Sequence, residues 1–314
     1  MGEVRIIGGQ YKRTPLPVVD ADGHAVGVFT DGDLRRLLET PRDWRTVPMA
    51  EVMHRNPRSV GPDQLAVEAV EVMETHRINQ LLVVDAAGVD TILIGDSLGM
   101  VVQGHDTTLP VTQRDAVYHT ACVARGSKRA FIIGDMPFGT FQLGPEDTFR
   151  NAAEIMAAGA QMVKLEGGAL MADTVRFLVE RGIPVCAHIG LIPQSVHALG
   201  GFRVQGRDAA GAKRLLDDAQ ILAEAGANIV LMEAMPAALA QSVTAAIKVP
   251  TIGIGAGPDC SGQVLVMHDM LGVSGYQPKF ARDFMAGTGT VAAAVNAYIT
   301  AVKSGSFPGP ENCY

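Results

Sequence analysis

The sequence predicts an α/β protein, in which a parallel β/α barrel follows a small α+β module. From about residue 90, short apolar runs alternate with helix-like segments of roughly 10–15 residues, a pattern typical of βαβ units and a parallel sheet. Four of these runs end in an acid: Asp96, Asp135, Glu166 and Glu233. Because a buried carboxylate is costly unless it is paired or metal-bound, we expect these acids to converge at one end of the barrel.

The barrel elements are expected in regular order. Strands are predicted at residues 91–95, 130–134, 161–166, 184–188, 228–233 and 250–254, with a weaker one at 273–277. Helices are predicted at residues 113–125, 146–158, 169–181, 208–225, 236–247 and 279–303. This amounts to seven βα units, whereas a closed barrel of this kind has eight.

Composition excludes several classes of partner. The net charge of −7 over 314 residues argues against nucleic acid, which needs a basic face. No apolar run approaches the roughly 20 residues of a membrane helix, and no signal peptide is recognised, so no membrane partner and a cytoplasmic location are expected. The four cysteines are scattered without a C-x-x-C pair, so reduced thiols are expected.

The first 85 residues have a different pattern, so the predicted domains are residues 1–85 and 86–314. Two strand-like runs flank the hairpin signal Asp22-Gly23, and the runs LPVVDADG and LLVVDAAG look like one repeat used twice. The expected elements are strands at 16–20, 25–30 and 80–85 and helices at 31–39 and 63–76.

This module resembles a CBS-domain pair, particularly the regulatory tail of bacterial arabinose 5-phosphate isomerases. The runs LPVVDADGHAVGVFTDGDLRRLLE and VMHRNPRSVGPDQLAVEAVEVMETHRINQLLVVD carry the resemblance. It implies that Thr30 and Asp33 lie where such domains hold a ribose or phosphate. The first repeat lacks its opening helix and the second stops after its first strand. We therefore expect a truncated CBS-like module that does not bind an adenine nucleotide.

The acids that follow the first two barrel strands allow two interpretations. Asp96 begins DSLGM and Asp135 lies in GDMPF, so each could be a metal ligand or could cap a turn or helix. Lys164 and Glu166 lie two apart on a strand and therefore point the same way. They could form a buried ion pair, or Lys164 could bind an anionic substrate group beside a hydrated metal. Oxygen ligands with retained waters favour Mg²⁺.

Two further residues are candidates for acid–base chemistry. His188 ends VCAHIG and could be a core histidine or could hydrogen-bond a developing oxyanion. Glu233 follows an apolar strand without a neighbouring basic residue in sequence, which suits a general base. The glycine-rich segment 190–206 is a candidate lid. The run Gly253–Gly257 does not open an early βαβ unit, so we reject a dinucleotide site and expect close backbone approach to a ligand.

From about residue 87 onward the chain resembles the ketopantoate hydroxymethyltransferase family. The matching runs are GVDTILIGDSLGMVVQGHDTTLPVT, GDMPFGTF, MVKLEGG, PVCAHIGLIPQSV, GGFRVQGR, IGIGAG and QVLVMHD. The resemblance implies a Mg²⁺-dependent (β/α)8 TIM-type barrel and a homo-oligomer, since the family forms decamers. By position, it implies metal binding by Asp96, Asp135 and Glu166, substrate binding by Asp96, Ser97, Asp135 and Lys164, and catalysis by Glu233 as proton acceptor with His188 assisting at the substrate oxygen.

The resemblance also implies the reaction. A hydroxymethyl group passes from the co-substrate 5,10-methylenetetrahydrofolate to 3-methyl-2-oxobutanoate through a Mg²⁺-stabilised enolate, giving 2-dehydropantoate in pantothenate biosynthesis. The chain departs from the family pattern because the native first strand and helix are missing. Our hypothesis is that residues 81–84 supply the first strand. Two alternatives stay open: an inactive fusion with an incomplete barrel, and a Mg²⁺-dependent 2-oxo acid lyase or mutase of the phosphoenolpyruvate mutase type, whose K-K-C-G-H loop is absent here.

Overall fold

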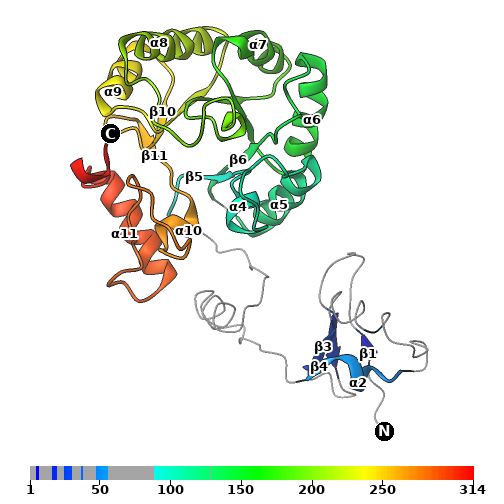
Figure 1. Ribbon diagram of the computed structural model, residues 1–314. Helices are drawn as coiled ribbons and strands as arrows, with labels where there is room; N and C mark the ends of the chain where they lie inside the picture. The colour runs from blue at the N-terminus through cyan, green and yellow to red at the C-terminus, as the bar shows by residue number, and fades with distance from the viewer. Residues whose placement is uncertain are drawn as a thin grey trace. The chain divides into compact units, whose positions relative to one another are not determined.

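The computed structural model describes residues 5–6, 16–19, 25–29, 37, 47–55, 88–127 and 129–314. The chain divides into two compact units, Met1–Leu81 and Leu82–Tyr314, and each is described by itself (Figure 1). The boundary expected at residue 85 stays a prediction.

The first unit contains an antiparallel sheet. Strands β2 (Leu16–Val19) and β3 (Ala25–Phe29) pair with Leu16 opposite Phe29, which confirms the two strands expected around the hairpin. The order of the described strands is β1-β2-β3-β4, where β1 is Arg5–Ile6 and β4 is His54–Arg55, and the short helix α2 is Met49–Val52. The expected helix 63–76, strand 80–85, Thr30 and Asp33 lie outside the described residues, as does helix 31–39 apart from Leu37, which is helical.

The second unit is built on a parallel sheet in which each described strand pairs with the next one along the chain. The strands are β5 (Thr91–Ile94), β6 (Phe131–Asp135), β7 (Met162–Glu166), β8 (Val185–Gly190), β9 (Ile229–Glu233), β10 (Thr251–Ile254) and β11 (Gly262–Gln263). The first six confirm the expected strands within two residues at every end. Because the strands are parallel, each connection returns the chain to the same edge of the sheet before the next strand begins, as the alternating pattern predicts.

The weak strand expected at 273–277 is wrong. Gly272 and Gly275 have positive φ angles of 68° and 71°. The Ser274 hydroxyl approaches Asp269 Oδ1 and the Tyr276 carbonyl, each at 2.7 Å, and these local bonds form a turn. The seventh strand is β11 instead, which pairs with β10 through Ile252 and Gly253.

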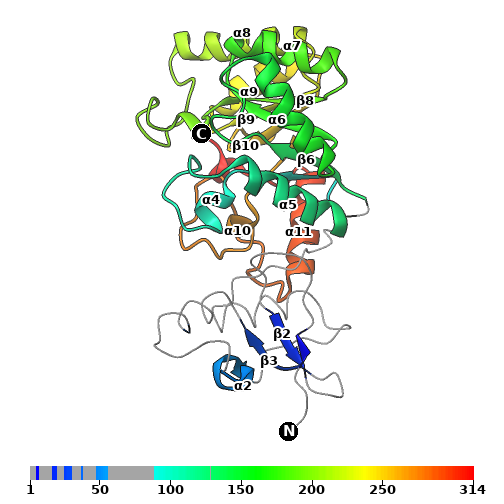
Figure 2. The same cartoon turned by 90° about the vertical axis from the view of Figure 1, so that its right-hand side faces the viewer.

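Helices surround the outside of the curved sheet (Figures 1 and 2). Their bounds are α4 (Leu98–Val101), α5 (Gln113–Gly126), α6 (Pro145–Ala157), α7 (Ala172–Glu180), α8 (Ala209–Glu224), α9 (Ala237–Ala246), α10 (Met267–Met270) and α11 (Val291–Lys303). The first half of the helix expected at 279–303 is wrong. Thr290 caps α11 by accepting from Ala293 N at 3.2 Å, and positive φ angles at Gly287 and Gly289 interrupt any earlier helix.

The core has two layers because side chains alternate along each strand. The outer layer lies between strands and helices and includes Val163, Leu165 and Val230. The inner layer is a separate apolar cluster on the other face of the sheet. Its buried members are Ile133, Met162, Cys186, Leu231 and Ile254. Burying each such side chain contributes about 1.5–3 kcal/mol to stability. The inner layer therefore stabilises the sheet beneath the residues at the C-terminal ends of the strands.

Among the described residues, β5 and β11 each pair with one strand only, so this sheet has two open edges. That agrees with the expected barrel lacking one strand and its helix. Residues 81–84, the hypothetical substitute strand, lie outside the described residues. In the part of the chain that the structure describes, no helix combines the length and apolar character needed to cross a bilayer.

Candidate active site

Strand register brings most of the predicted site residues to one end of the sheet. Asp135 lies opposite Lys164, and Glu166 lies opposite His188. Glu233 lies opposite Gly190 at the end of β9. These side chains share the inner face with the apolar layer but lie two or four residues further along. The expectation that the strand-ending acids converge is therefore correct in its geometry.

Asp96 and Asp135 are joined through the turn after β5. The Asp96 backbone N–H donates to Asp135 Oδ2 at 3.0 Å. Ser97 lies in the same turn and precedes α4. A side chain on Gly95 would lie 3.0 Å from Ser97 Oγ, so the glycine gives Ser97 its place beside the acids. Both aspartates are buried, with exposed fractions of 5% and 2%.

Lys164 neutralises part of this buried charge. Its Nζ lies 2.7 Å from Asp135 Oδ1 and 3.6 Å from Glu166 Oε1. Burial alone would lower the pKa of Lys164, but the carboxylates of Asp135, Glu166 and Asp96 outweigh it and hold the pKa above its usual range. The ammonium therefore stays charged, as either reading of Lys164 requires.

His188 lies between two glutamates. Its Nδ1 is 3.6 Å from Glu166 Oε1, and its Nε2 is 3.3 Å from Glu233 Oε2. Burial would lower the pKa of His188, but the two carboxylates raise it to about 9. Burial also works against the ionised form of Glu166, yet Lys164 and His188 lower its pKa.

The cluster has more acidic than basic side chains. Asp96, Asp135, Glu166 and Glu233 face two cationic side chains, so two negative charges are unbalanced when all four acids are ionised. Burial, followed by repulsion from Asp135, raises the pKa of Asp96 to about 8. A divalent cation beside Asp96 would relieve this imbalance.

The carboxylates at this site suit Mg²⁺, which retains waters, better than a metal ion whose ligands are all protein side chains. Among the residues that the structure describes, no three His, Cys, Asp or Glu side chains form a group that could hold an ion by themselves. Two adjacent aspartates would leave the remaining positions to water and substrate oxygens. Mg²⁺ is commonly bound in this way, through one or two carboxylates with several retained waters.

Gln194 belongs to this site, although the sequence analysis did not predict it as a site residue. Its side chain is buried against Asp96 and the Met136 carbonyl, and its backbone N–H donates to Glu166. It lies in a short 3₁₀ helix, Pro193–Ser195, within the predicted lid segment. A neutral amide in a glycine-rich loop carries no charge or spacing signal that would have marked it. Whether segment 190–206 moves as a lid stays a prediction.

Glycines at two places near the site are explained by close contacts that leave no room for a side chain. Gly190 has φ 94°, and a side chain there would lie 2.3 Å from the Glu233 carbonyl. Gly255 and Gly257 also have positive φ, and side chains on them would meet Phe280 and Ala237 at 2.9 and 2.5 Å. The run Gly253–Gly257 thus allows close packing within the protein.

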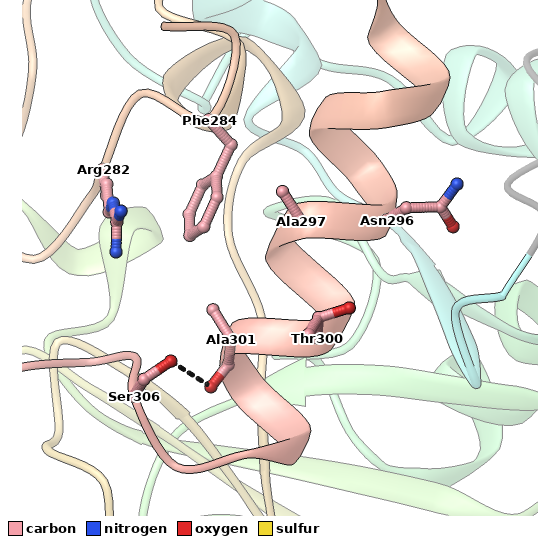
Figure 3. Close-up of a pocket in the computed structure, with 7 residues that line it drawn as sticks. All are labelled: Arg282, Phe284, Asn296, Ala297, Thr300, Ala301 and Ser306. Carbon is pink, nitrogen blue, oxygen red and sulfur yellow. Dashed lines mark hydrogen bonds between the residues drawn. The ribbon is translucent and has the colours of Figure 1, made fainter. Parts of the chain in front are cut away.

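A separate cavity of about 390 Å³ lies beside α11 (Figure 3). The Ser306 hydroxyl donates to the Ala301 carbonyl at 3.3 Å in its wall. The cavity contains none of the predicted site residues, so it is distinct from the carboxylate cluster. Its lining residues are Arg282, Phe284, Asn296, Ala297, Thr300, Ala301 and Ser306.

Comparisons with known proteins give two family matches. The family model described as ketopantoate hydroxymethyltransferase matches residues 67–310, and a CBS-domain model matches residues 10–40. The ketopantoate hydroxymethyltransferase match begins inside the segment that the sequence pattern assigned to the second CBS-like repeat.

Individual relatives agree. A 3-methyl-2-oxobutanoate hydroxymethyltransferase from Burkholderia multivorans is 54% identical over 279 residues, covering 88% of this chain and 99% of the relative. Another from Thiobacillus denitrificans is 58% identical over 247 residues, covering 79% and 94%. Among solved structures, a phosphoenolpyruvate phosphomutase from Streptomyces platensis subsp. rosaceus aligns with 87% of this chain and 88% of that one, at 14% identity and a TM-score of 0.45. On the family match and these identities, the chain belongs to the ketopantoate hydroxymethyltransferase family.

Proposed function

We propose that this chain is a 3-methyl-2-oxobutanoate hydroxymethyltransferase. It transfers a hydroxymethyl group from 5,10-methylenetetrahydrofolate to 3-methyl-2-oxobutanoate, giving 2-dehydropantoate in pantothenate biosynthesis. The observation that carries the proposal is the buried cluster of four carboxylates and two cations at one end of the parallel strands, in a chain of this family.

The metal is proposed to be Mg²⁺. Asp96 and Asp135 would hold it directly, while Glu166 would act from outside the first coordination shell, because Lys164, His188 and Gln194 already surround it. When bound, the ion supplies Lewis-acid polarisation of the 2-oxo group, which acidifies the C3 proton.

Glu233 is proposed as the base that accepts the C3 proton. Its side chain is 16% exposed, against 2–3% for His188 and Glu166, so a substrate can reach it from the mouth of the barrel. His188 Nε2 lies 3.3 Å from Glu233 Oε2 and orients that carboxylate. Because the His188 pKa is about 9, its ring is protonated at neutral pH, and Nε2 would donate to the substrate oxygen once Glu233 turns toward C3.

Lys164 and Ser97 are proposed to bind the 2-oxo acid. Lys164 is buried and charged, so a substrate carboxylate would find a fixed cation beside Asp135. Ser97 adds a hydroxyl in the turn next to Asp96. Together they would orient the substrate so that its C3 faces Glu233.

The atoms balance with water as a co-reactant. The C3–H bond breaks and its proton passes to Glu233, while C3 forms a new bond to the folate methylene carbon. The two bonds from that carbon to N5 and N10 of the folate break, and these nitrogens take up the C3 proton and one proton of the water. That carbon gains its hydroxyl oxygen from water, and the folate leaves as tetrahydrofolate.

The remaining expectations belong to the same proposal. We infer a homo-oligomer in the cytoplasm, with a domain boundary near residue 85 and a CBS-like module that binds no adenine nucleotide. The CBS-domain match to residues 10–40 supports the presence of part of such a module.

Hydrogen exchange at C3 tests the function without folate. In D₂O with Mg²⁺, the protein should replace the C3 proton of 3-methyl-2-oxobutanoate with deuterium, seen as loss of its proton NMR signal, and EDTA should stop it. Adding 5,10-methylenetetrahydrofolate should then give 2-dehydropantoate. Exchange without transfer would favour a lyase or mutase of the phosphoenolpyruvate mutase type. No exchange by a folded sample would favour the inactive fusion.

A further inference from the structure

A single buried glutamine contacts two acids of the cluster, Asp96 in the turn after β5 and Glu166 at the end of β7. Gln194 is 4% exposed. Its backbone N–H donates to Glu166 Oε2 at 3.0 Å, and its side-chain Nε2 donates to Asp96 Oδ2 at 2.9 Å. The same Nε2 donates to the Met136 carbonyl, also at 2.9 Å. One residue therefore bridges the turn after β5, the segment after β6 and the end of β7.

The chemistry of the partners fixes the orientation of this amide. The Met136 carbonyl can only accept a hydrogen bond, so the group facing it must be the NH₂ and not the amide oxygen. Both Nε2 protons are then used, one on Met136 and one on Asp96. The amide oxygen accepts from Gln142 Nε2 at 3.4 Å, and Gln142 Oε1 in turn accepts from Gly139 N at 2.8 Å. Two linked amides thus hold one rotamer of Gln194.

This arrangement affects a pair of acids that burial disfavours. Gln194 holds Asp96 through Oδ2, and Asp135 Oδ2 is held by the Asp96 backbone. Each aspartate is therefore oriented by a fixed donor before any cation arrives. Groups that orient metal ligands in this way typically change metal affinity by about 10–100-fold when removed.

We propose that Gln194 is a positioning residue that couples the position of residues 191–206, within the predicted lid segment 190–206, to divalent-cation affinity at Asp96 and Asp135. The identity of the cation rests on the proposed function; the link itself rests on the contacts of Gln194. The side-chain amide cannot reach Asp96 and Met136 unless the 3₁₀ helix Pro193–Ser195 is in place. A cation that binds Asp96 in the orientation held by Gln194 consequently favours this placement of the segment, and the coupling is reciprocal.

The test compares the full-length protein with Gln194→Met and Ser195→Ala. Methionine keeps the buried volume and the backbone bond to Glu166 but removes both side-chain donors. Ser195→Ala alters the neighbouring position of the same 3₁₀ helix and serves as the matched control. Mg²⁺ affinity is measured by isothermal titration calorimetry. Amide hydrogen exchange of residues 191–206 is measured with and without Mg²⁺.

We expect Gln194→Met to weaken Mg²⁺ binding by about 10–100-fold, with Ser195→Ala close to the unaltered protein. Mg²⁺ should slow amide exchange in residues 191–206 of the unaltered protein and of Ser195→Ala, and should do so less in Gln194→Met at equal fractional saturation. In the exchange assay at C3, kcat at saturating Mg²⁺ should fall far less than the apparent affinity for Mg²⁺. If Gln194→Met does not fold, Gln194→Asn replaces it, because the shorter amide cannot span both acceptors.

Outcomes separate this proposal from the proposed function. Unchanged Mg²⁺ affinity in Gln194→Met, or equal protection of residues 191–206 at equal saturation, overturns the coupling while the function stands. A loss of kcat with unchanged Mg²⁺ affinity also overturns it. If the unaltered protein binds no Mg²⁺, the proposed function and the coupling fail together.

Discussion

Two levels of the inner face of the same strands have opposite chemistry, although the second level begins only two positions further along each strand. The lower level is an apolar cluster, and the upper level is a chain of ion pairs with distances of 2.7 to 3.6 Å. Each of the strands β6 to β9 contributes one residue to the lower level and one to the upper level. In strand order these are Ile133 and Asp135, Met162 and Lys164, Cys186 and His188, and Leu231 and Glu233.

The difference teaches how stability and chemistry are divided within one barrel. The apolar level gains free energy from burial, whereas the ionic level must offset the desolvation of six charged or ionisable groups. Because β-strand periodicity repeats every two residues, the sheet aligns both levels with the same register. Changes at the two levels should therefore have separable effects.

The largest expected effect is on chemistry at the upper level. Glu233→Gln keeps the shape of the side chain but cannot accept the C3 proton, so C3 exchange should fall by about 10²–10⁴-fold. Proton NMR of 3-methyl-2-oxobutanoate in D₂O measures the rate, and the thermal midpoint serves as the control for folding. Exchange within tenfold of the unaltered protein would remove Glu233 from the role of base.

Lys164→Met should destabilise the protein through the upper level. The substitution leaves Asp135 and Glu166 buried without their cation, at a cost of about 3–5 kcal/mol in the free energy of unfolding at neutral pH. Urea unfolding measures it. The deficit should shrink at acidic pH, where the carboxyls are neutral. A pH-independent deficit would indicate lost packing rather than lost charge.

Met162→Ala tests the lower level on the same strand. Met162 is 5% exposed, so truncation should reduce the free energy of unfolding by about 2–5 kcal/mol. The rate of C3 exchange per folded molecule should stay close to that of the unaltered protein. A selective loss of exchange without loss of stability would show that the two levels are not separable.

The same comparison explains what the sequence could predict. Three site acids could be predicted because an acid at the end of a buried strand is costly unless it is paired or binds a metal. Side-chain alternation along the strands then placed Asp135, Glu166 and Glu233 on one face. Gln194 could not be found, since its partners lie 28, 58 and 98 residues away and its amide carries no charge. The errors at 273–277 and 279–290 arose where Ser274 and Thr290 form local side-chain bonds that compete with regular structure.

A further expected effect concerns the pH dependence of the metal-free protein. Asp96 has an ordinary pKa of 3.8 and a folded-state pKa of about 8, raised first by burial and then by Asp135. Between these values the folded state binds the proton that the unfolded state releases, so this group's contribution to stability is lost as pH rises toward 8. The metal-free thermal midpoint should therefore fall between pH 5 and pH 8. Asp96→Asn should flatten the decline, because the amide does not ionise.

Saturating Mg²⁺ should oppose the decline in the unaltered protein and not in Asp96→Asn, since the cation favours the ionised carboxylate that burial disfavours. Differential scanning fluorimetry at fixed ionic strength, with EDTA or Mg²⁺, measures both slopes. A midpoint of Asp96→Asn that declines as steeply as that of the unaltered protein would assign the pH dependence to other groups.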